Sequence, residues 1–197
     1  MKSLNKWEQA QSWEAHWHDT VATNSYFEEM KQLTYAKKMG IEIYPTPYTL
    51  YNFKNYGKVL DIGGGDCSML LKVEGKLNGC VVIDPCDYAK WSIMRYKHKG
   101  IKFIKMKGED LDLTGFDEVW IYNCLQHTED PEKICYNAKN AGKLIRIFEW
   151  VETPINEGHI HTLTKKDLDK WLGAYGRVET LNADGCFGPA YYAIVQC

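Results

Sequence analysis

The pattern of hydrophobic and polar residues has two different periods along the chain. Over residues 6–40, apolar side chains recur with a helical period in a mostly polar background, and Asn24 or Ser25 can cap a second helix after a break at residues 22–25. Pro45 and Pro47 follow, and proline lacks the amide donor that a continuing helix needs. We therefore expect two helices joined by a short turn, and then a separate core.

Beyond this extension, short apolar runs alternate with helical segments. The predicted strands cover residues 58–62, 80–83, 101–105, 118–122 and 144–150, and the predicted helices cover residues 66–74, 88–97, 131–140 and 165–172. Pro131 at a first turn and Thr164 at a cap position support two of the helix starts. Residues 177–181 and 191–196 have no helix between them, so they predict an antiparallel hairpin around residues 184–189. This alternation is typical of an α/β fold with a mostly parallel sheet.

Composition sets the domain count and excludes some partners. The 197 residues, 45% of them hydrophobic, are enough for one sizeable core, so we expect an N-terminal helical extension or lid over residues 1–50 and a core over residues 51–197. The net charge is −2, and the lysines form no long basic block. This balance argues against nucleic acid as a partner.

The sequence shows no sign of export or membrane insertion. Residues 1–8 lack the apolar core of a signal peptide, and no apolar run approaches the ~18 residues of a spanning helix. The seven cysteines are odd in number and include no Cys-x-x-Cys pair, which disfavours a disulfide framework or a structural zinc site. We expect a cytoplasmic protein with reduced cysteines and no membrane association.

Candidate chemistry is concentrated at a glycine-rich turn after the first core strand. Asp61 stands at the end of the strand, and Gly63, Gly64 and Gly65 remove every Cβ where backbone must approach a ligand closely. A pyrophosphate cradle needs Gly-x-Gly-x-x-Gly without facing acids, whereas Ser68 holds the third glycine position and Asp66 adds a second carboxylate. The turn therefore favours a cofactor that carries positive charge, although a tight turn without a ligand is the simpler alternative.

This turn resembles the first motif of class I S-adenosylmethionine-dependent methyltransferases, Asp-x-Gly-x-Gly, through Asp61, Gly63 and Gly65. The resemblance implies S-adenosyl-L-methionine as cofactor, since its sulfonium and amino group are positive. It also implies a Rossmann-like, seven-stranded, mostly parallel sheet whose C-terminal hairpin is antiparallel. The small-molecule (type 11-like) branch is the closest match to the later motifs.

Two further acidic segments are candidates for cofactor binding. Asp84, followed by Pro85, ends a strand about twenty residues after the glycine turn, where a carboxylate can accept hydrogen bonds from ribose hydroxyls. A helix-capping aspartate is the alternative. The resemblance implies that Glu109 or Asp110, after the third strand, faces the adenine amino group, and the spacing does not decide between them.

The segment 116–131 resembles the fourth-strand region of small-molecule methyltransferases, in which a strand runs into Leu-x-His and then Asp-Pro. Asn123 and Gln126 are expected beside the glycine turn at the carboxyl end of the sheet and are assigned to cofactor binding. Enzymes that methylate nucleobase amino groups carry Asn or Asp followed by Pro-Pro-Tyr or Phe here, and this chain departs from that pattern. His127 is a candidate general base, and packing beneath the cofactor is its alternative.

Acceptor-side candidates come from distant parts of the chain. Glu149 ends the fifth core strand, and His159 and His161 precede the next helix; we expect Glu149 to contact substrate and either histidine to act as a base. These residues could hold a divalent cation, but alternating histidines in a loop are more often hydrogen-bonded spacers, so no metal is assigned. Trp13 and Trp17, one helical turn apart, are assigned to the substrate side of a lid, with ordinary packing on the sheet as the alternative.

Together these features predict a methyltransferase that modifies a small-molecule acceptor at a hydroxyl group, with a sugar or glycan precursor as one candidate class. A non-catalytic cofactor-binding module is the first alternative. A nicotinamide-dependent oxidoreductase is the second, and the missing third glycine and the acids of the turn argue against it.

Overall fold

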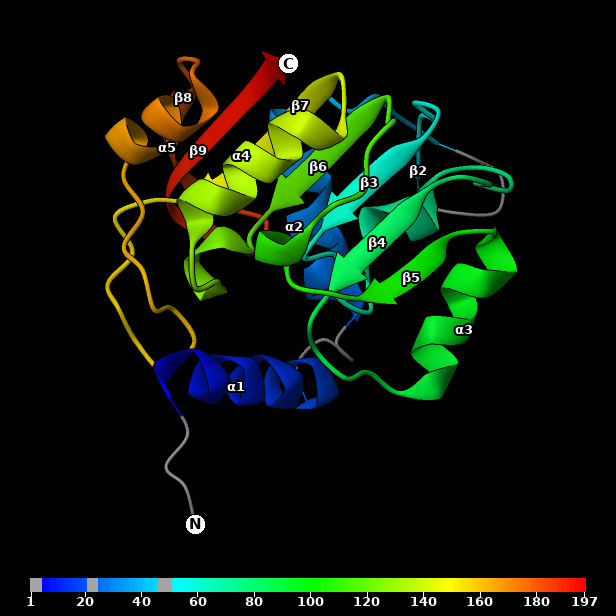
Figure 1. Cartoon of the computed structure of the whole chain (residues 1–197), viewed down its shortest axis with the longest axis horizontal. Helices are drawn as coiled ribbons and strands as arrows, with labels where there is room; N and C mark the ends of the chain where they lie inside the picture. Colours follow the sequence, from blue (N-terminus) through cyan, green and yellow to red (C-terminus); the bar gives the residue numbers. More distant parts are fainter. Residues whose placement is uncertain (1–4, 21–24, 46–50) are drawn as a thin grey trace.

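The structure, a computed structural model, is described for residues 5–20, 25–45 and 51–197, with the side chains of residues 17–20 and 25–27 left out of the description. Its centre is a seven-stranded sheet in the order β5-β4-β3-β6-β7-β9-β8 (Figure 1). The strands are β3 (Val59–Ile62), β4 (Val81–Asp84), β5 (Lys102–Lys105), β6 (Glu118–Tyr122), β7 (Leu144–Trp150), β8 (Arg177–Ala183) and β9 (Cys186–Gln196). The first five strands pair in parallel, and β9 lies antiparallel between β7 and β8. The predicted fold class is confirmed.

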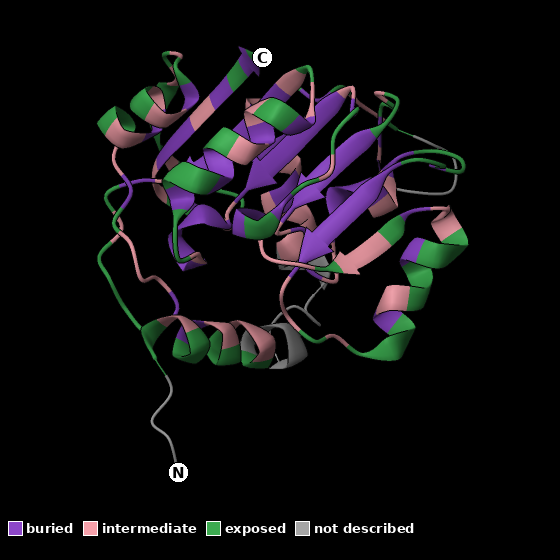
Figure 2. Ribbon diagram, in the orientation of Figure 1, coloured by how far each residue is buried: buried purple, intermediate pink, exposed green. Residues whose placement is uncertain are grey.

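The central strands are apolar on both faces because helices cover both faces. β3, β4 and β6 are buried at every position, as the continuous purple of these strands in Figure 2 shows. Strands that are covered on both sides read as nearly continuous apolar runs, and Val59–Ile62 is recognisable as such a strand although Asp61 interrupts it.

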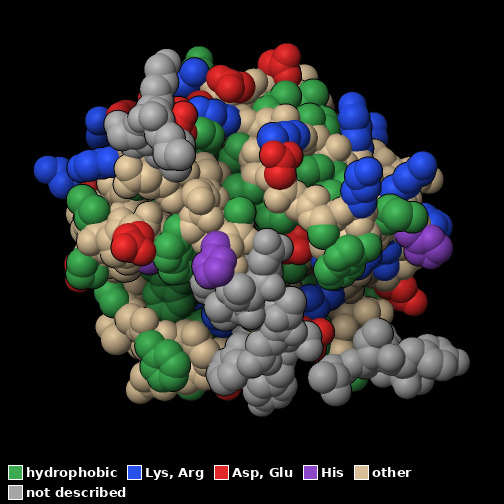
Figure 3. All heavy atoms as spheres, turned by 90° about the horizontal axis from the view of Figure 1, so that it is seen from below, with side chains coloured by type: hydrophobic (Ala, Val, Ile, Leu, Met, Phe, Trp, Pro, Cys, Tyr) green, Lys and Arg blue, Asp and Glu red, His purple; other side chains and the backbone are tan. Residues whose placement is uncertain are grey.

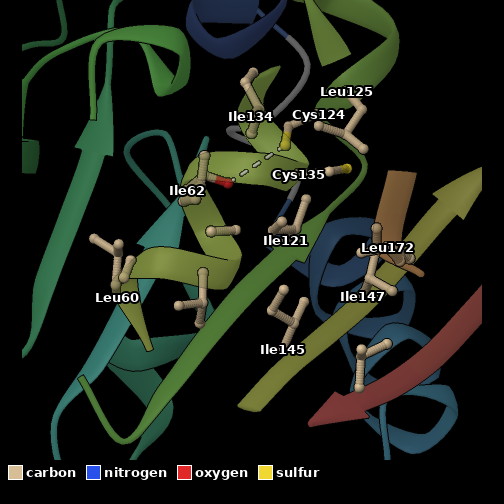
Figure 4. Close-up of a cluster of buried hydrophobic side chains, with 14 of the residues drawn as sticks. Leu60, Ile62, Ile121, Cys124, Leu125, Ile134, Cys135, Ile145, Ile147 and Leu172 are labelled. Carbon is tan, nitrogen blue, oxygen red and sulfur yellow. Dashed lines mark hydrogen bonds between the residues drawn. The ribbon is translucent and has the colours of Figure 1, made fainter. Parts of the chain in front are cut away.

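One face of the sheet is covered by α4 (Pro131–Ala141) and α5 (Lys165–Leu172). Figure 4 shows this layer, with Ile121, Ile145 and Ile147 of the strands packed towards side chains such as Leu172 of α5. Both helices begin as the sequence predicts: the Asp130 side chain accepts from the Lys133 amide, and the Thr164 side chain accepts from the Asp167 amide.

The other face is covered by α2 (Ser25–Lys38), by α3 (Lys90–Lys99) and by a two-stranded sheet of β1 (Ile43–Tyr44) and β2 (Asn52–Phe53). Tyr35, Ala36 and Met39 at the C-terminal end of α2 are buried in this core. The Arg146 guanidinium, bonded to Glu118 (2.8 Å), also donates to the Met39 carbonyl (2.8 Å) and thereby ties the end of α2 to the sheet.

The first helix, α1 (Lys6–Thr20), lies across the carboxyl ends of the parallel strands (Figure 1). It starts with a capping box, because the Glu8 amide donates to Asn5 Oδ1 (2.9 Å) and the Asn5 amide donates to Glu8 Oε2 (2.8 Å). The two predicted N-terminal helices are therefore present. The division into a lid of residues 1–50 and a core remains a prediction, and part of α2 already belongs to the core.

Three local predictions were wrong or incomplete. The helix predicted over residues 66–74 is a short 3-10 turn, Met69–Lys72, because the chain becomes extended at Val73, which forms a β-bridge with Phe53. The hairpin turn is tighter than the predicted loop, since Ala183 already pairs with Cys186. The β1–β2 pair was not predicted, because two-residue strands carry no periodicity.

Candidate functional site

The principal pocket lies where the glycine turn after β3, the ends of β4 and β6, and helices α1 and α2 meet. The predicted cofactor residues that line it are Gly63, Gly64, Gly65, Asp84, Pro85, Glu109 and Asn123. The sheet topology places them together, because the carboxyl ends of parallel strands meet at one edge.

The glycine turn cannot carry side chains without displacing its neighbours. Gly63 has φ +71°, and a Cβ there would lie 2.6 Å from the Cβ of Cys124. A Cβ on Gly64 would lie 2.7 Å from Asp61 Oδ2, and Gly65 has φ +57°. The positive φ angles require glycine at positions 63 and 65, and the close neighbours require it at positions 63 and 64. The turn therefore presents backbone without side chains to the pocket.

Asp61 lies beneath the turn and does not line the pocket. Its side chain is fully buried, and Oδ2 accepts from the Ser68 hydroxyl and from the Tyr122 hydroxyl (2.6 Å), while Oδ1 is buried without a hydrogen-bond partner among the described residues. Burial, with a smaller contribution from the nearby Asp84, raises the pKa of Asp61 to about 7, although the hydrogen bonds from the two hydroxyls act in the opposite direction. Asp61 therefore acts on the turn from below, whereas the sequence suggested a carboxylate that faces the ligand.

Asp84 is the carboxylate that reaches the pocket wall. Its Oδ2 accepts from the Gly65 amide (3.1 Å), and its Oδ1 accepts from the Cys86 amide (2.9 Å) and the Tyr88 hydroxyl (3.0 Å). These bonds fix the carboxylate directly against the glycine turn, at the place where a nucleoside would lie.

The structure separates the two acids that the sequence could not distinguish. Glu109 is buried and lines the pocket, and its Oε1 accepts from the amides of Glu129 (2.8 Å) and Asp130 (3.1 Å). Asp110 is exposed and is not among the residues of this pocket wall.

The loop after β6 forms the boundary between this pocket and a second one. Asn123 has φ +51°, and the following short turn, Leu125–His127, brings Gln126 and His127 inward. Glu149, fully buried in β7, holds this loop: its Oε1 accepts from the amides of Cys124 (3.0 Å) and Leu125 (3.1 Å). Burial raises the pKa of Glu149 to about 7. Glu149 is absent from the walls of both pockets, so the structure assigns it to positioning where the sequence suggested substrate contact.

His127 stands at the boundary and lines both pockets. Its Nδ1 lies 2.7 Å from the Gly158 carbonyl oxygen and 3.1 Å from Glu14 Oε1 of α1. Because both neighbours are acceptors, the imidazole hydrogen belongs on Nδ1. The other ring nitrogen, Nε2, lies 3.4 Å from the Gln126 amide nitrogen and is the basic nitrogen of the neutral ring.

The other two candidate histidines differ in their positions. His159 packs edge-on against His127, with ring centroids 4.9 Å apart, and it lines the second pocket. Burial, with a smaller contribution from His127, lowers the pKa of His159 to about 4, so this ring is neutral at physiological pH. His161 lines neither pocket, and its Nε2 is buried without a hydrogen-bond partner among the described residues.

The second pocket, which we call the acceptor pocket, opens beside the first on the α1 side of the molecule, the side that Figure 3 views. It shares Glu14, Tyr35, Asn123 and His127 with the cofactor pocket. Its remaining walls are Trp13, Lys31, Gln126, the segment 150–154, His159 and the hairpin residues 185 and 187–189. The side chain of Trp17 lies outside the described residues.

Comparison with known proteins agrees with this geometry. Residues 60–143 match a family model described as "Methyltransferase domain". These residues therefore form a methyltransferase domain. S-adenosyl-L-methionine is the cofactor of such a domain, and the bare turn and the carboxylate of Asp84 fit it. No curated protein sequence matches the chain.

Solved structures show the same fold at low sequence identity. A protein from Thermotoga maritima described as an S-adenosylmethionine-dependent methyltransferase and possible histamine N-methyltransferase shares 13% identity with a TM-score of 0.59, over 98% of this chain and 99% of its own. The N-methyltransferase NodS from Bradyrhizobium japonicum WM9, solved with S-adenosyl-L-homocysteine, shares 12% identity with a TM-score of 0.61, over 98% of each chain.

A third example is the 1,6-didemethyltoxoflavin-N1-methyltransferase from Burkholderia thailandensis. It shares 12% identity with a TM-score of 0.62, over 100% of this chain and 92% of its own. At such identities the likeness concerns the fold, and the three proteins differ in the molecules named with them.

Several residues of the methyltransferase pockets were missed from the sequence. Glu14 lies between Trp13 and Trp17, and its contact with His127 joins residues that are far apart in the chain. Tyr35, Trp150 and Phe187 carried no motif, and only their aromatic character could have drawn attention to them. In the described part of the chain no helix has the length and apolar content to cross a membrane, and no three His, Cys, Asp or Glu side chains are arranged to hold a metal ion.

Proposed function

We propose that the protein transfers the methyl group of S-adenosyl-L-methionine to a hydroxyl group of a small molecule held in the acceptor pocket, with His127 as the proton acceptor. The observation that carries this proposal is the position of His127, which lines both pockets and is held at Nδ1 by Glu14 and Gly158.

The charge of the cofactor pocket supports a positively charged ligand. Glu14, Glu28, Asp84 and Glu109 line it, against one lysine, Lys107. The cofactor supplies an electrophilic methyl group when bound. Asp84 would hold the ribose, the glycine turn would allow close approach of the cofactor, and Glu109 is the acid placed to meet the adenine.

The proton chemistry follows from the tautomer of His127. A hydroxyl nucleophile must lose its proton around the time the methyl group arrives, and a positioned imidazole can take it. With the hydrogen on Nδ1, His127 accepts this proton at Nε2, and Glu14 stabilises the imidazolium through Nδ1, 3.1 Å away. His159, neutral through its lowered pKa, places no competing positive charge beside the imidazolium.

The acceptor pocket has polar groups where it meets the cofactor pocket and aromatic groups around its walls. Asn123, Gln126 and His159 offer hydrogen-bonding groups, and Trp13, Trp150 and Phe187 offer flat apolar surface. This combination suits a hydroxylated ring, and a sugar or glycan precursor is the first class to screen.

An amine acceptor is the second candidate function. It is favoured by the relatives of the same fold from Bradyrhizobium japonicum and Burkholderia thailandensis, which are named as N-methyltransferases. The two candidates differ in their need for a base, because an amine can lose its proton to solvent before it binds. Loss of the His127 imidazole should therefore harm hydroxyl methylation much more than amine methylation.

Two measurements test the proposal. Calorimetry on protein stripped of cofactor should show binding of S-adenosyl-L-methionine and S-adenosyl-L-homocysteine; binding of NAD in their place would overturn it. Release of S-adenosyl-L-homocysteine should then be followed with hydroxylated sugars, phenols, amines and thiols.

With a hydroxyl acceptor, His127→Asn should lower kcat by about 10²–10⁴-fold at unchanged cofactor affinity. His98→Asn, on the exposed face of α3, is the matched control and should behave as wild type. If only amines were methylated, the acceptor group would be an amine, which is the second candidate, and not a hydroxyl group. Cofactor binding without turnover of any acceptor would indicate a non-catalytic module.

A further inference from the structure

We propose that Glu152 binds a positively charged group of the acceptor, so that the acceptor is an organic cation with a ring and a hydroxyl group. This inference deepens the proposed function and rests on it. Glu152 lines the acceptor pocket just after the end of β7.

The backbone of Glu152 is held in a conformation that its side chain disfavours. Its φ is +58°, in the left-handed region. Two other non-glycine residues of the described chain share this region, Asn123 and Asp184, and Asn and Asp tolerate it because their short side chains bond locally. Glutamate has no such compensation.

Hydrogen bonds on both sides hold Glu152 in place. Its amide donates to the Leu163 carbonyl (2.8 Å), and the amide of Val151 donates to the Pro189 carbonyl (3.0 Å). The segment is thus fixed between the loop before α5 and strand β9. Strain that the surroundings maintain is typical of residues whose side chain must point to a ligand.

Among the acidic residues of the acceptor pocket, Glu152 is the one placed to bind a ligand. Lys31 lies in the same pocket, and its ammonium contacts Glu28 at 2.5 Å. Glu14 contacts His127, whose ring it orients. The side chain of Glu152 is exposed to solvent at the pocket wall. A cationic ligand would therefore meet a carboxylate there.

The aromatic rings around Glu152 favour the same class of ligand. Trp150 and Phe187 lie in the same pocket wall as Glu152, and Trp13 of α1 belongs to it too. An exposed acid among aromatic faces is the usual environment for organic ammonium groups, which gain from both the carboxylate and the ring quadrupole.

The ligand class follows from two polar residues of the pocket. His127 lines both pockets, so the hydroxyl group belongs where they meet, and Glu152 is an exposed residue of the acceptor pocket alone. Amino sugars and hydroxylated arylalkylamines have this arrangement of a hydroxyl, a ring and an ammonium group. Neutral compounds of the same shape would lack the contact with Glu152.

The test compares matched cationic and neutral compounds. Glucosamine against glucose, and tyramine against 4-ethylphenol, should be titrated into the protein saturated with S-adenosyl-L-homocysteine. The cationic member of at least one pair should bind about tenfold more tightly. Glu152→Asn removes the charge and suits the left-handed backbone, so it should abolish the preference and raise the Tm.

Glu157→Gln is the matched control, because Glu157 is an exposed acid in the same loop outside the acceptor pocket. It should keep the preference of the wild type. Equal binding within both pairs, no binding of any of the four compounds, or a preference that survives in Glu152→Asn would overturn the inference. If the inference about Glu152 fails but the protein binds S-adenosyl-L-methionine and methylates a neutral hydroxylated acceptor, the proposed function still holds. If the protein does not bind the cofactor, both the inference and the proposed function are wrong.

Discussion

The two pockets of this methyltransferase are built in different ways. The core wall of the cofactor pocket comes from the ends of β3, β4 and β6 and the turn after β5, and each contribution is a short local motif. The acceptor pocket combines α1, α2, the loop after β6, the segment after β7 and the β8–β9 hairpin, which are spread over the chain. A parallel sheet brings its strand ends together by topology alone, whereas the acceptor pocket depends on how several separate elements pack.

The pockets also differ in burial. The carboxyl groups around the cofactor pocket are 0% (Asp61), 6% (Asp84) and 8% (Glu109) exposed, and all three are fixed by hydrogen bonds. In the acceptor pocket, Trp13 is 39% and Phe187 is 73% exposed. The first site is preorganised for one ligand, and the second presents adaptable surface. Substitutions should therefore have larger effects on the cofactor side.

Among the substitutions that compare the two pockets by ligand binding and stability, the largest effect is expected from Gly63→Ala. The new methyl group would meet Cys124 in a backbone conformation that favours glycine, so we expect cofactor affinity to fall at least about 100-fold and stability to fall with it. Calorimetry and urea unfolding measure the two effects.

Gly115→Ala is the control for backbone strain, because Gly115 has φ +86° and nothing within 4 Å of its added Cβ. It should cost about 1 kcal/mol of stability and leave cofactor binding unchanged. An equal loss of affinity in both variants would contradict the role assigned to close approach at Gly63.

The next effect concerns pH and the loop that separates the pockets. Burial raises the pKa of Glu149 from 4.5 to about 7 in the folded protein. Folding therefore favours the protonated form of Glu149. The stability that this form contributes to the folded protein is fully present below the pKa of the unfolded state, 4.5, and is lost as the pH rises through the pKa of the folded state, about 7. The loss amounts to up to about 3 kcal/mol.

Unfolding free energies at pH 5 and pH 8 should accordingly differ more in the wild type than in Glu149→Gln. Asp61 shifts in the same direction, so the difference between the two proteins isolates Glu149. Identical pH dependence in both would show that Glu149 does not titrate in this range. Glu157→Gln should retain the dependence of the wild type.

A smaller effect is expected from Asp84→Asn. The amide keeps an acceptor for the Gly65 amide but loses the charge that meets the ribose hydroxyls, so cofactor affinity should fall by about 10- to 30-fold. Asp87→Asn, which removes an exposed acid paired with Lys105, is the control and should bind normally.

Of the two acids after β5, Glu109→Gln should weaken cofactor binding and Asp110→Asn should not. The reverse result would assign the adenine contact to Asp110.

The smallest effect is expected from Trp13→Ala. The Trp13 ring lies against Gly158, where an added Cβ would be 2.9 Å from its Cε3 atom, and it forms part of the acceptor pocket. Its loss should raise the acceptor KM by about 3- to 10-fold and leave cofactor affinity unchanged. Trp91→Ala, on the exposed side of α3, should change neither value. A change in cofactor affinity instead would assign α1 to cofactor binding alone.

Particular elements show which features the sequence could predict. Strands such as Val59–Ile62, the capped helices α4 and α5, and the order of motifs were predictable because apolar runs, caps and turns are local signals. The helix after the glycine turn was predicted wrongly, since Val73 is extended and forms a β-bridge with Phe53, a residue that is distant in the chain. Glu149 was assigned to substrate because the sequence places it at a strand end but does not show which way its side chain points.

The sequence by itself determined the sheet, the glycine turn and the cofactor class, because these depend on residues that are neighbours in the chain or stand at the ends of parallel strands. The tertiary structure alone decided that Asp61 supports the turn from below, that Glu109 and not Asp110 reaches the pocket, and that Glu14 meets His127. Each of these depends on side-chain direction and on packing between distant elements, which the periodicity of a sequence does not encode.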